Sequence, residues 1–359
     1  MRSSASGPPR TDLHLLDLLA TRSMPAGGIF LSLTRRCPLH CAHCSTRSSM
    51  RAEQHSAEPF LRLVESFTPE SRPDVMWLTG GEPLVRPRLV TQLAGRAREA
   101  GTTTALLSGM WFAERGPSDS VARALRAVDH VSASIDRFHE AEVPRAAVLA
   151  QLRDLLDEGR SVSVHLVVDR PGDPYLGEAV GDIRTVLDDR CPVHVSVLAP
   201  VGRGGDIAQA ALARASTGAD PCELASWPVV VYDGTVIACC SQLAVDGPAP
   251  EHLRLGHAAA DTWEVIRYRA LTSPTVRALR TYGPGWIADR HGGGACDGYC
   301  ETCMSLSNDP AVSVRVGAHM QRPGIDLLER HAAAAMPEAR QWVDPPFGEL
   351  LELGRRPAA

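Results

Sequence analysis

The sequence of 359 residues contains no lysine, so all 37 of its basic residues are arginines. This absence excludes a lysine Schiff base, a lysine general base and the lysine of a nucleotide-binding P-loop. The sequence also lacks a run of about 18 apolar residues, so we expect no transmembrane helix. The first residues have neither a continuous apolar stretch nor a small-residue cleavage site. We therefore expect no secretory signal and a cytoplasmic location.

The charge balance is mildly acidic, with 37 basic against 42 acidic residues and a net charge of −5. A protein that binds the phosphate backbone of a nucleic acid is normally basic, so we expect no nucleic-acid partner. The length corresponds to about two domains. A chain of this size can bury a sufficient core without disulfides.

The first half of the chain alternates between short apolar, β-branched segments and amphipathic ones. Alternation of this kind favours a parallel sheet with helices on its outer face. Six such units are too few for a closed eight-stranded barrel and predict an open, partial (β/α)6 barrel of the TIM type, an α/β fold. The chemistry is then expected in the loops that follow the carboxyl ends of the strands. The expected strands are residues 29–33, 75–78, 103–107, 130–135, 161–168 and 193–198.

The rhythm changes after about residue 215, where a smaller α+β domain is expected to begin. Val229–Tyr232 and Thr235–Ala238 flank Asp233-Gly234, which is typical of a β-hairpin turn. A single helix is expected over Thr262–Arg280.

Ten cysteines are present, and most of them are clustered. In a reducing compartment, clustered cysteines indicate metal ligands or redox groups before disulfides. Cys37, Cys41 and Cys44 form a C-x3-C-x2-C motif directly after the first expected strand. Three thiolates on one loop can hold three irons of a [4Fe-4S] cluster and leave the fourth iron open. A zinc site that uses His40 or His43 as the fourth ligand is the alternative.

This motif, followed after the second expected strand by Gly80-Gly81-Glu82-Pro83, resembles the radical SAM family. The resemblance implies that the open iron binds the amino and carboxylate groups of S-adenosylmethionine (SAM). It also implies that the Gly80–Pro83 loop meets the methionine amino group. Ser134 and Asp136, at the end of the fourth strand, resemble the position that contacts the SAM ribose or carboxylate. A helix cap is the alternative for these two residues.

The second cysteine group also resembles a known arrangement. Cys222 and Cys239 flank the expected hairpin, and Cys300-x2-Cys303 follows far downstream. The pattern resembles the twitch domain, a shortened SPASM domain, and implies that these four cysteines hold one auxiliary [4Fe-4S] cluster. A structural zinc site is the alternative. The expected organisation is then an N-terminal extension, a radical SAM barrel, a twitch domain and a C-terminal tail, over residues 1–27, 28–215, 216–310 and 311–359.

Several other residues are candidates for the chemistry. Cys296 is either a cluster ligand or a thiol near the active site, and Cys240 is expected to point away from its neighbour Cys239. His139 is a candidate general base, because histidine titrates near neutral pH. Arg203, in a Gly-rich turn after the sixth strand, can bind a substrate carboxylate or phosphate; a flexible linker is the alternative.

The resemblance implies a reaction class. The reduced cluster would cleave SAM to a 5′-deoxyadenosyl radical, which takes a hydrogen from a substrate. The auxiliary cluster would accept an electron, giving net oxidation or cross-linking. The expected substrate is a ribosomally made peptide or another natural product. A hydrogen returned by Cys296 or Cys240 would instead give epimerisation, and a dehydrogenase or epimerase of a small sugar-like metabolite is the alternative.

The expected partners follow from the same reaction class. They are a peptide or small-molecule substrate, an external electron donor such as flavodoxin or ferredoxin, and a separate peptide-recognition protein. In a further class, the chain is a non-catalytic iron–sulfur or zinc scaffold.

Overall fold

The computed structural model describes residues 13–170, 172–207, 219–294, 296–334 and 347–355. The boundary expected at residue 215 lies outside these ranges. Among the described residues, no helix combines the length and the apolar character needed to cross a membrane.

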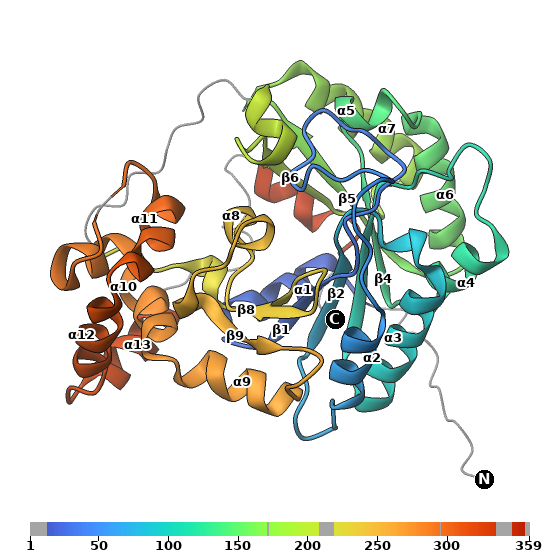
Figure 1. Ribbon diagram of the computed structural model, residues 1–359. Helices are drawn as coiled ribbons and strands as arrows, with labels where there is room; N and C mark the ends of the chain where they lie inside the picture. The colour runs from blue at the N-terminus through green and yellow to red at the C-terminus, as the bar shows by residue number, and fades with distance from the viewer. Residues whose placement is uncertain (1–12, 171, 208–218, 295, 335–346, 356–359) are drawn as a thin grey trace, which may run out of the picture.

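The first part of the chain is a sheet of parallel strands with helices on its outer face (Figure 1). All six strands expected from the sequence are present, and each pairs in parallel with the next along the chain. The strands are β1 (Gly28–Ser32), β2 (Val75–Thr79), β3 (Thr103–Ser108), β4 (His130–Ser134), β5 (Ser161–Val168) and β6 (Val193–Val197). The helices between them are α2 (Glu58–Glu65), α3 (Pro87–Ala100), α4 (Asp119–Ala127), α5 (Arg137–Glu140), α6 (Arg145–Asp157) and α7 (Pro174–Leu187).

The residue pattern explains the side-chain orientation in β5 and the two ends of α3. In β5, Val162 and Val164 are buried on the face that the helices cover, whereas Ser163 points to the inside of the curved sheet. Helix α3 begins with Pro87 and ends at Gly101, which has a φ of 90°. A left-handed residue after a helix favours glycine, because glycine carries no Cβ.

The inner face of the curved sheet is polar near the amino ends of β4 and β5. His130 on β4 donates to or accepts from two hydroxyls of β5, Ser161 at 2.7 Å and Ser163 at 2.8 Å. Ser163 donates in turn to Ser132, at 3.0 Å. Both ring nitrogens of this fully buried histidine therefore have partners.

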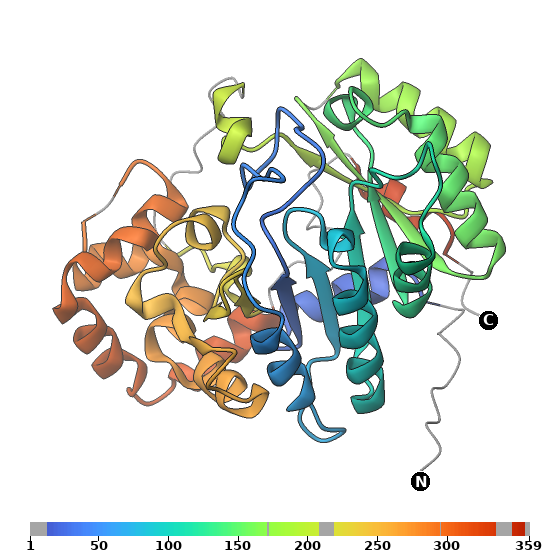
Figure 2. The same cartoon turned by 45° about the vertical axis from the view of Figure 1, so that its right-hand side comes forward.

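The second part of the chain extends the same sheet (Figure 2). β7 (Val229–Val230) pairs in parallel with β1, and the antiparallel strands β8 (Thr235–Ile237) and β9 (Arg254–His257) follow. The expected hairpin is confirmed, and Gly234 in its turn has a φ of 96°. The helices are α8 (Gln242–Asp246), α9 (Trp263–Thr272), α10 (Pro274–His291), α11 (Tyr299–Ser305), α12 (Pro310–Met320) and α13 (Ile325–Ala334).

The single helix expected over Thr262–Arg280 was wrong, because the structure has two helices there. α9 ends at Thr272, and Ser273 has a ψ of 117° before Pro274 opens α10. A proline disfavours the helical conformation of the residue before it.

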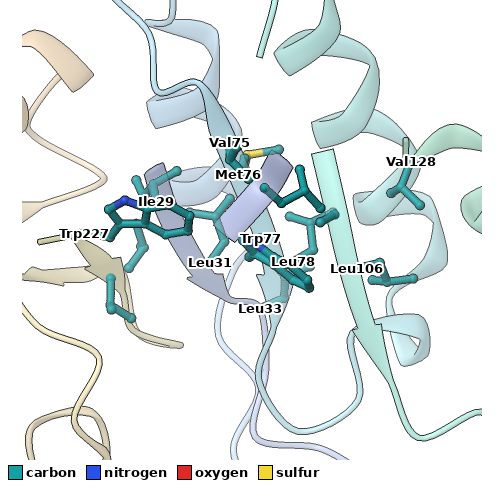
Figure 3. Packing of buried hydrophobic residues seen from close by; sticks show 14 of the residues in the cluster. Ile29, Leu31, Leu33, Val75, Met76, Trp77, Leu78, Leu106, Val128 and Trp227 are labelled. Carbon is teal, nitrogen blue, oxygen red and sulfur yellow. The ribbon is translucent and has the colours of Figure 1, made fainter. Parts of the chain in front are cut away.

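A tryptophan joins the two parts of the chain. Trp227 precedes β7 and is fully buried. Its indole packs against the start of β1, where a Cβ on Gly28 would lie 2.5 Å from the ring. Figure 3 shows Trp227 next to Ile29, at one end of an apolar layer that continues through Met76 and Leu106. The hydrophobic core is thus continuous from one part to the other.

Both ends of the described chain pack on these two parts. α1 (Leu15–Ala20) and η8 (Phe347–Glu352) contact β5 and β6 respectively, and the His14 Nε2 lies 2.9 Å from the Leu353 carbonyl oxygen. α12 and α13 pack against α10. The described portions of residues 311–359, the segment expected as a C-terminal tail, thus pack partly on α10 and partly on β6.

Candidate functional site

The three cysteines of the C-x3-C-x2-C motif line one cavity of about 270 Å³. It lies at the carboxyl ends of the parallel strands, as expected. Pro83 and Asp136 do not line it. The other sequence-predicted residues in its wall are His43, Gly80, Gly81, Glu82, Ser134, His139 and Arg203.

Hydrogen bonds and charge distinguish the thiols of this loop. Burial raises the pKa of Cys37 to about 12. Burial alone would also raise the pKa of Cys44, whose Sγ accepts a hydrogen bond from the Ser48 amide at 3.4 Å. That bond, a hydroxyl contact from Thr46 and the positive charge of Arg203 more than offset burial and hold the pKa below its usual value. Cysteine binds iron as the thiolate, so donors aimed at sulfur fit a ligand role.

Two glycines allow the loop after β2 to lie directly against the cysteine loop. A Cβ on Gly80, which has a φ of 130°, would lie 2.5 Å from the Thr34 carbonyl oxygen. A Cβ on Gly81 would lie 2.5 Å from the carbonyl oxygen of Arg36. The Gly81 amide donates to Thr34 at 2.6 Å, and the Glu82 amide donates to Arg36 at 2.8 Å. Only glycine fits at these two positions, because the loop after β2 lies in backbone contact with the cysteine loop.

The Glu82 carboxylate ties together the loops after β2 and β3. It accepts hydrogen bonds from the amides of Leu84 and Gly109, both at 2.9 Å, and from the Ser108 hydroxyl at 3.0 Å. Burial raises its pKa to about 7. Its contact with a methionine amino group stays a prediction.

Ser134 and Asp136 have separate surroundings. Ser134 faces the cavity, whereas the fully buried Asp136 caps α5, accepting from the amides of Phe138 at 2.9 Å and His139 at 3.0 Å. The Asp136 Oδ2 also lies 2.7 Å from the His139 Nδ1 and 3.3 Å from the His43 Nε2. The helix-cap alternative thus describes Asp136, and a SAM contact through it stays a prediction.

The same carboxylate governs the charge of His139. Burial lowers the pKa of this histidine, but the hydrogen bond that it donates to Asp136, together with the neighbouring Cys41, outweighs burial and raises the pKa to about 10. A histidine held as a cation donates hydrogen bonds and is a poor general base at neutral pH. The base role expected for His139 stays a prediction.

The four cysteines of the second group come together from three segments. Cys222 precedes β7, Cys239 follows β8, and Cys300 and Cys303 lie on α11. Burial raises the pKa of Cys222 to about 11, and the charge of Cys300 raises it further. Burial and then the neighbouring thiols, Cys222 among them, raise the pKa of both Cys239 and Cys303. Four neighbouring thiols, two of them buried and two half-buried, fit a site that binds a metal or a cluster.

A histidine that the sequence did not single out borders this group. The His252 Nε2 lies 3.6 Å from the Cys303 Sγ, and its Nδ1 lies 2.6 Å from the Ser307 hydroxyl. Burial lowers the pKa of His252 to about 4, so the ring is neutral.

The remaining thiols do not line the cavity. Cys296 is exposed, and Cys191 is buried at the foot of β6. The Cys240 Sγ accepts a hydrogen bond from Arg22 at 3.5 Å, and the guanidinium of that arginine also lies over the Trp227 ring. A hydrogen-donor role for Cys296 or Cys240 stays a prediction.

Comparison with known families assigns the barrel. Residues 31–175 match the model of the Radical SAM superfamily. The matched residues run from β1 to the start of α7 and make up less than half of the chain.

Curated relatives match parts of the chain. The "PqqA peptide cyclase" of Streptomyces rochei is 35% identical over 111 residues, which are 30% of this chain and 29% of that protein. The "GTP 3′,8-cyclase" of Synechococcus sp. (strain CC9605) is 33% identical over 150 residues, or 40% of this chain and 41% of that protein. The chain thus spans less than half the length of these relatives.

Solved structures resemble a larger share of the chain. A structure described as native anSMEcpe with bound AdoMet and Cp18Cys peptide has a TM-score of 0.50 at 13% identity, covering 86% of this chain and 99% of that one. Streptococcus suis SuiB has a TM-score of 0.52 at 13% identity, covering 78% of this chain and 74% of its own. At this identity the likeness concerns the fold, which is that of a radical SAM partial barrel with a further domain.

Two further residues of the cavity wall belong to no motif. His165 on β5 and Ser196 on β6 line the cavity and lie 2.9 Å apart, Nε2 to Oγ. Both residues lie on expected strands, and the register of those strands turns their side chains inward.

Proposed function

We propose that this chain is an enzyme that binds SAM beside a [4Fe-4S] cluster held by Cys37, Cys41 and Cys44. The observation that carries the proposal is one cavity lined by these three cysteines and by the Gly80–Glu82 loop, within a radical SAM domain. With an electron from an external donor such as flavodoxin or ferredoxin, this cofactor supplies methionine and a 5′-deoxyadenosyl radical that takes a hydrogen atom from the substrate.

The protein's own residues hold and enclose the cofactors. Gly80 and Gly81 present backbone to the cavity, and Ser134 adds a hydroxyl. The buried Glu82 keeps the loops after β2 and β3 at a fixed distance, because its carboxylate bonds to both.

We propose further that residues 216–310 contain a twitch domain whose Cys222, Cys239, Cys300 and Cys303 hold an auxiliary [4Fe-4S] cluster. The electrostatic influence of these thiols on one another, which requires that they lie close together, supports this set. Net oxidation needs an acceptor for the electron that the substrate radical gives up, while a proton leaves to solvent. The second set of thiolates supplies a place for that acceptor.

The proposed substrate is a peptide, and the proposed outcome is oxidation or cross-linking. Two matching relatives carry the name "PqqA peptide cyclase", one from Streptomyces rochei and one from Granulibacter bethesdensis (strain ATCC BAA-1260 / CGDNIH1).

Formation of 5′-deoxyadenosine tests the activity. Anaerobic protein is mixed with SAM and dithionite, and the product is measured by chromatography. We expect product from the wild type and none from the Cys37→Ala/Cys41→Ala/Cys44→Ala variant. Cys191→Ala is the matched control, because this buried cysteine is remote from the cavity. Equal product from the triple variant and the control would refute the assignment of the ligands.

Mass spectrometry tests the substrate class. The enzyme is co-expressed with each short open reading frame that neighbours its gene, and the peptides are compared with those made alongside the triple variant. We expect one peptide to lose two hydrogens per modification with the wild type only. Unchanged masses for all of them, together with active SAM cleavage, would refute the peptide but not the enzyme class.

A further inference from the structure

A turn after β6 lies directly on the cysteine loop. The turn η3 (Gly202–Asp206) contains Arg203, whose backbone amide donates to the Cys44 carbonyl oxygen at 2.8 Å. Its guanidinium donates to two more carbonyl oxygens of the same loop, from Nε to Cys41 at 2.9 Å and from Nη1 to Ser48 at 2.8 Å. One residue thus binds the loop at three points, on both sides of Cys44.

The glycines that flank this arginine make the contact possible. A Cβ on Gly202, which has a φ of 56°, would lie 2.3 Å from the carbonyl oxygens of Cys44 and Ser45. A Cβ on Gly204 would lie 2.8 Å from the Ala199 carbonyl oxygen. A backbone this close to another backbone requires glycine at the first position. The Gly-rich stretch is therefore a fitted turn, and not the flexible linker that the sequence left open.

The position of this turn in the fold gives the contact its consequence. β6 forms one edge of the nine-stranded sheet, and β1, which carries the cysteine loop, lies five strands away. The blue loop after β1 in Figure 1 reaches across the top of the sheet to the segment after β6. Arg203 therefore ties the cysteine loop to the far edge of an open barrel.

The contact also reaches the sulfur of Cys44. Arg203 holds the Ser48 carbonyl oxygen, and the amide of the same residue, in the preceding peptide unit, donates to the Cys44 Sγ at 3.4 Å. Hydrogen bonds and positive charge near a cluster's sulfurs raise its reduction potential. Arg203 supplies a positive charge in the cavity wall, and its bond to the Ser48 carbonyl oxygen fixes the residue whose amide donates to Cys44.

We infer that Arg203 is a positioning residue that sets the geometry and reduction potential of the cluster at Cys37, Cys41 and Cys44, rather than a binding group for a substrate anion. The inference rests on the proposed function, because it assumes that these cysteines hold a cluster. It assigns to Arg203 two effects, one through its carbonyl contacts and one through its charge.

Three variants of the full chain separate these effects. Arg203→Gln removes the charge and the paired donors, whereas Arg203→Lys keeps the charge and loses the planar fork. Arg47→Gln is the matched control: Arg47 lies on the same loop and pairs with Asp206 of the same turn at 3.1 Å, but both side chains are more than half exposed. The control thus removes one arginine between the same segments but no side-chain hydrogen bond to Cys41, Cys44 or Ser48.

Two readouts are measured on anaerobically reconstituted protein. One is the rate at which a chelator removes iron, and the other is the midpoint potential of the reduced cluster whose electron paramagnetic resonance signal changes when SAM is added. We expect Arg203→Gln to lose iron about 10-fold to 100-fold faster than the wild type, as is typical when an outer partner of a ligand is removed. We also expect its potential to be more negative.

Arg203→Lys is expected to lose iron faster but to keep a potential near that of the wild type. Arg47→Gln is expected to match the wild type in both readouts. If Arg203→Gln does not fold, iron loss by Arg203→Lys at the rate of the control would overturn the inference. Arg203→Gln that matches Arg47→Gln in both readouts would overturn it as well.

A failure of the proposed function would look different. In that case the wild type itself would show no signal that responds to SAM, whatever residue stands at 203.

Discussion

The pH dependence of stability tests the description of the barrel interior. Burial, with a small contribution from His14, lowers the pKa of His130 from 6.5 to about 3. The ring is fully buried between the hydroxyls of Ser161 and Ser163 and is neutral there. His130→Gln keeps an amide that can donate and accept, but it cannot take up a proton.

The magnitude follows from the two pKa values of His130. Between pH 6.5 and about 3 the unfolded chain binds a proton at this histidine and the folded protein does not. Stability is therefore present in full above pH 6.5 and falls as the pH falls. At 1.36 kcal/mol per pH unit, the change from pH 7 to pH 5 costs about 2 kcal/mol through this one group.

Urea unfolding at the two pH values, followed by tryptophan fluorescence, measures the effect. We expect His130→Gln to lose about 2 kcal/mol less than the wild type between pH 7 and pH 5. His165, whose pKa burial also lowers to about 3, is present in both proteins and cancels in the difference. His331→Gln, on the exposed side of α13, is the control and should lose as much as the wild type. An equal loss in His130→Gln and the wild type would refute a neutral buried ring.

Three further changes have definite expected outcomes. Gly81→Ala should abolish 5′-deoxyadenosine formation, because its Cβ would lie 2.5 Å from a backbone oxygen; Gly95→Ala, with nothing within 4 Å, should retain it. Cys296→Ala should leave 5′-deoxyadenosine formation and the iron content unchanged, since the Cys296 side chain is exposed and does not line the cavity; a loss of iron would show that Cys296 is a ligand. Trp227→Ala should lower the free energy of unfolding by about 3–5 kcal/mol, measured by denaturant unfolding, and a change below about 1 kcal/mol would contradict its role in the shared core.

Local patterns made much of the fold predictable. The strand over Ser161–Val168 was found at its observed limits, because alternate residues face the core and the polar interior. Cys37, Cys41 and Cys44 were found together because their spacing along one loop is itself the signal.

Contacts between distant segments were not predictable in the same way. The pairing of β7 with β1 depends on a register that neither segment carries alone. Arg203 looked like a group for a substrate anion, and only the approach of the Cys41 and Ser48 carbonyl oxygens shows what it binds. Asp136 has the sequence position of a SAM contact but the hydrogen bonds of a helix cap.

Iron content is the most direct test of the central claim that the chain holds two clusters. It is measured after anaerobic purification of the wild type, the Cys37/Cys41/Cys44→Ala variant and the Cys222/Cys239/Cys300/Cys303→Ala variant. We expect about eight irons in the wild type and about four in each variant. About four irons in the wild type, none in the first variant, and zinc that disappears only in the second would contradict this claim. The second domain would then hold a structural metal, and the proposed oxidation would have no electron acceptor.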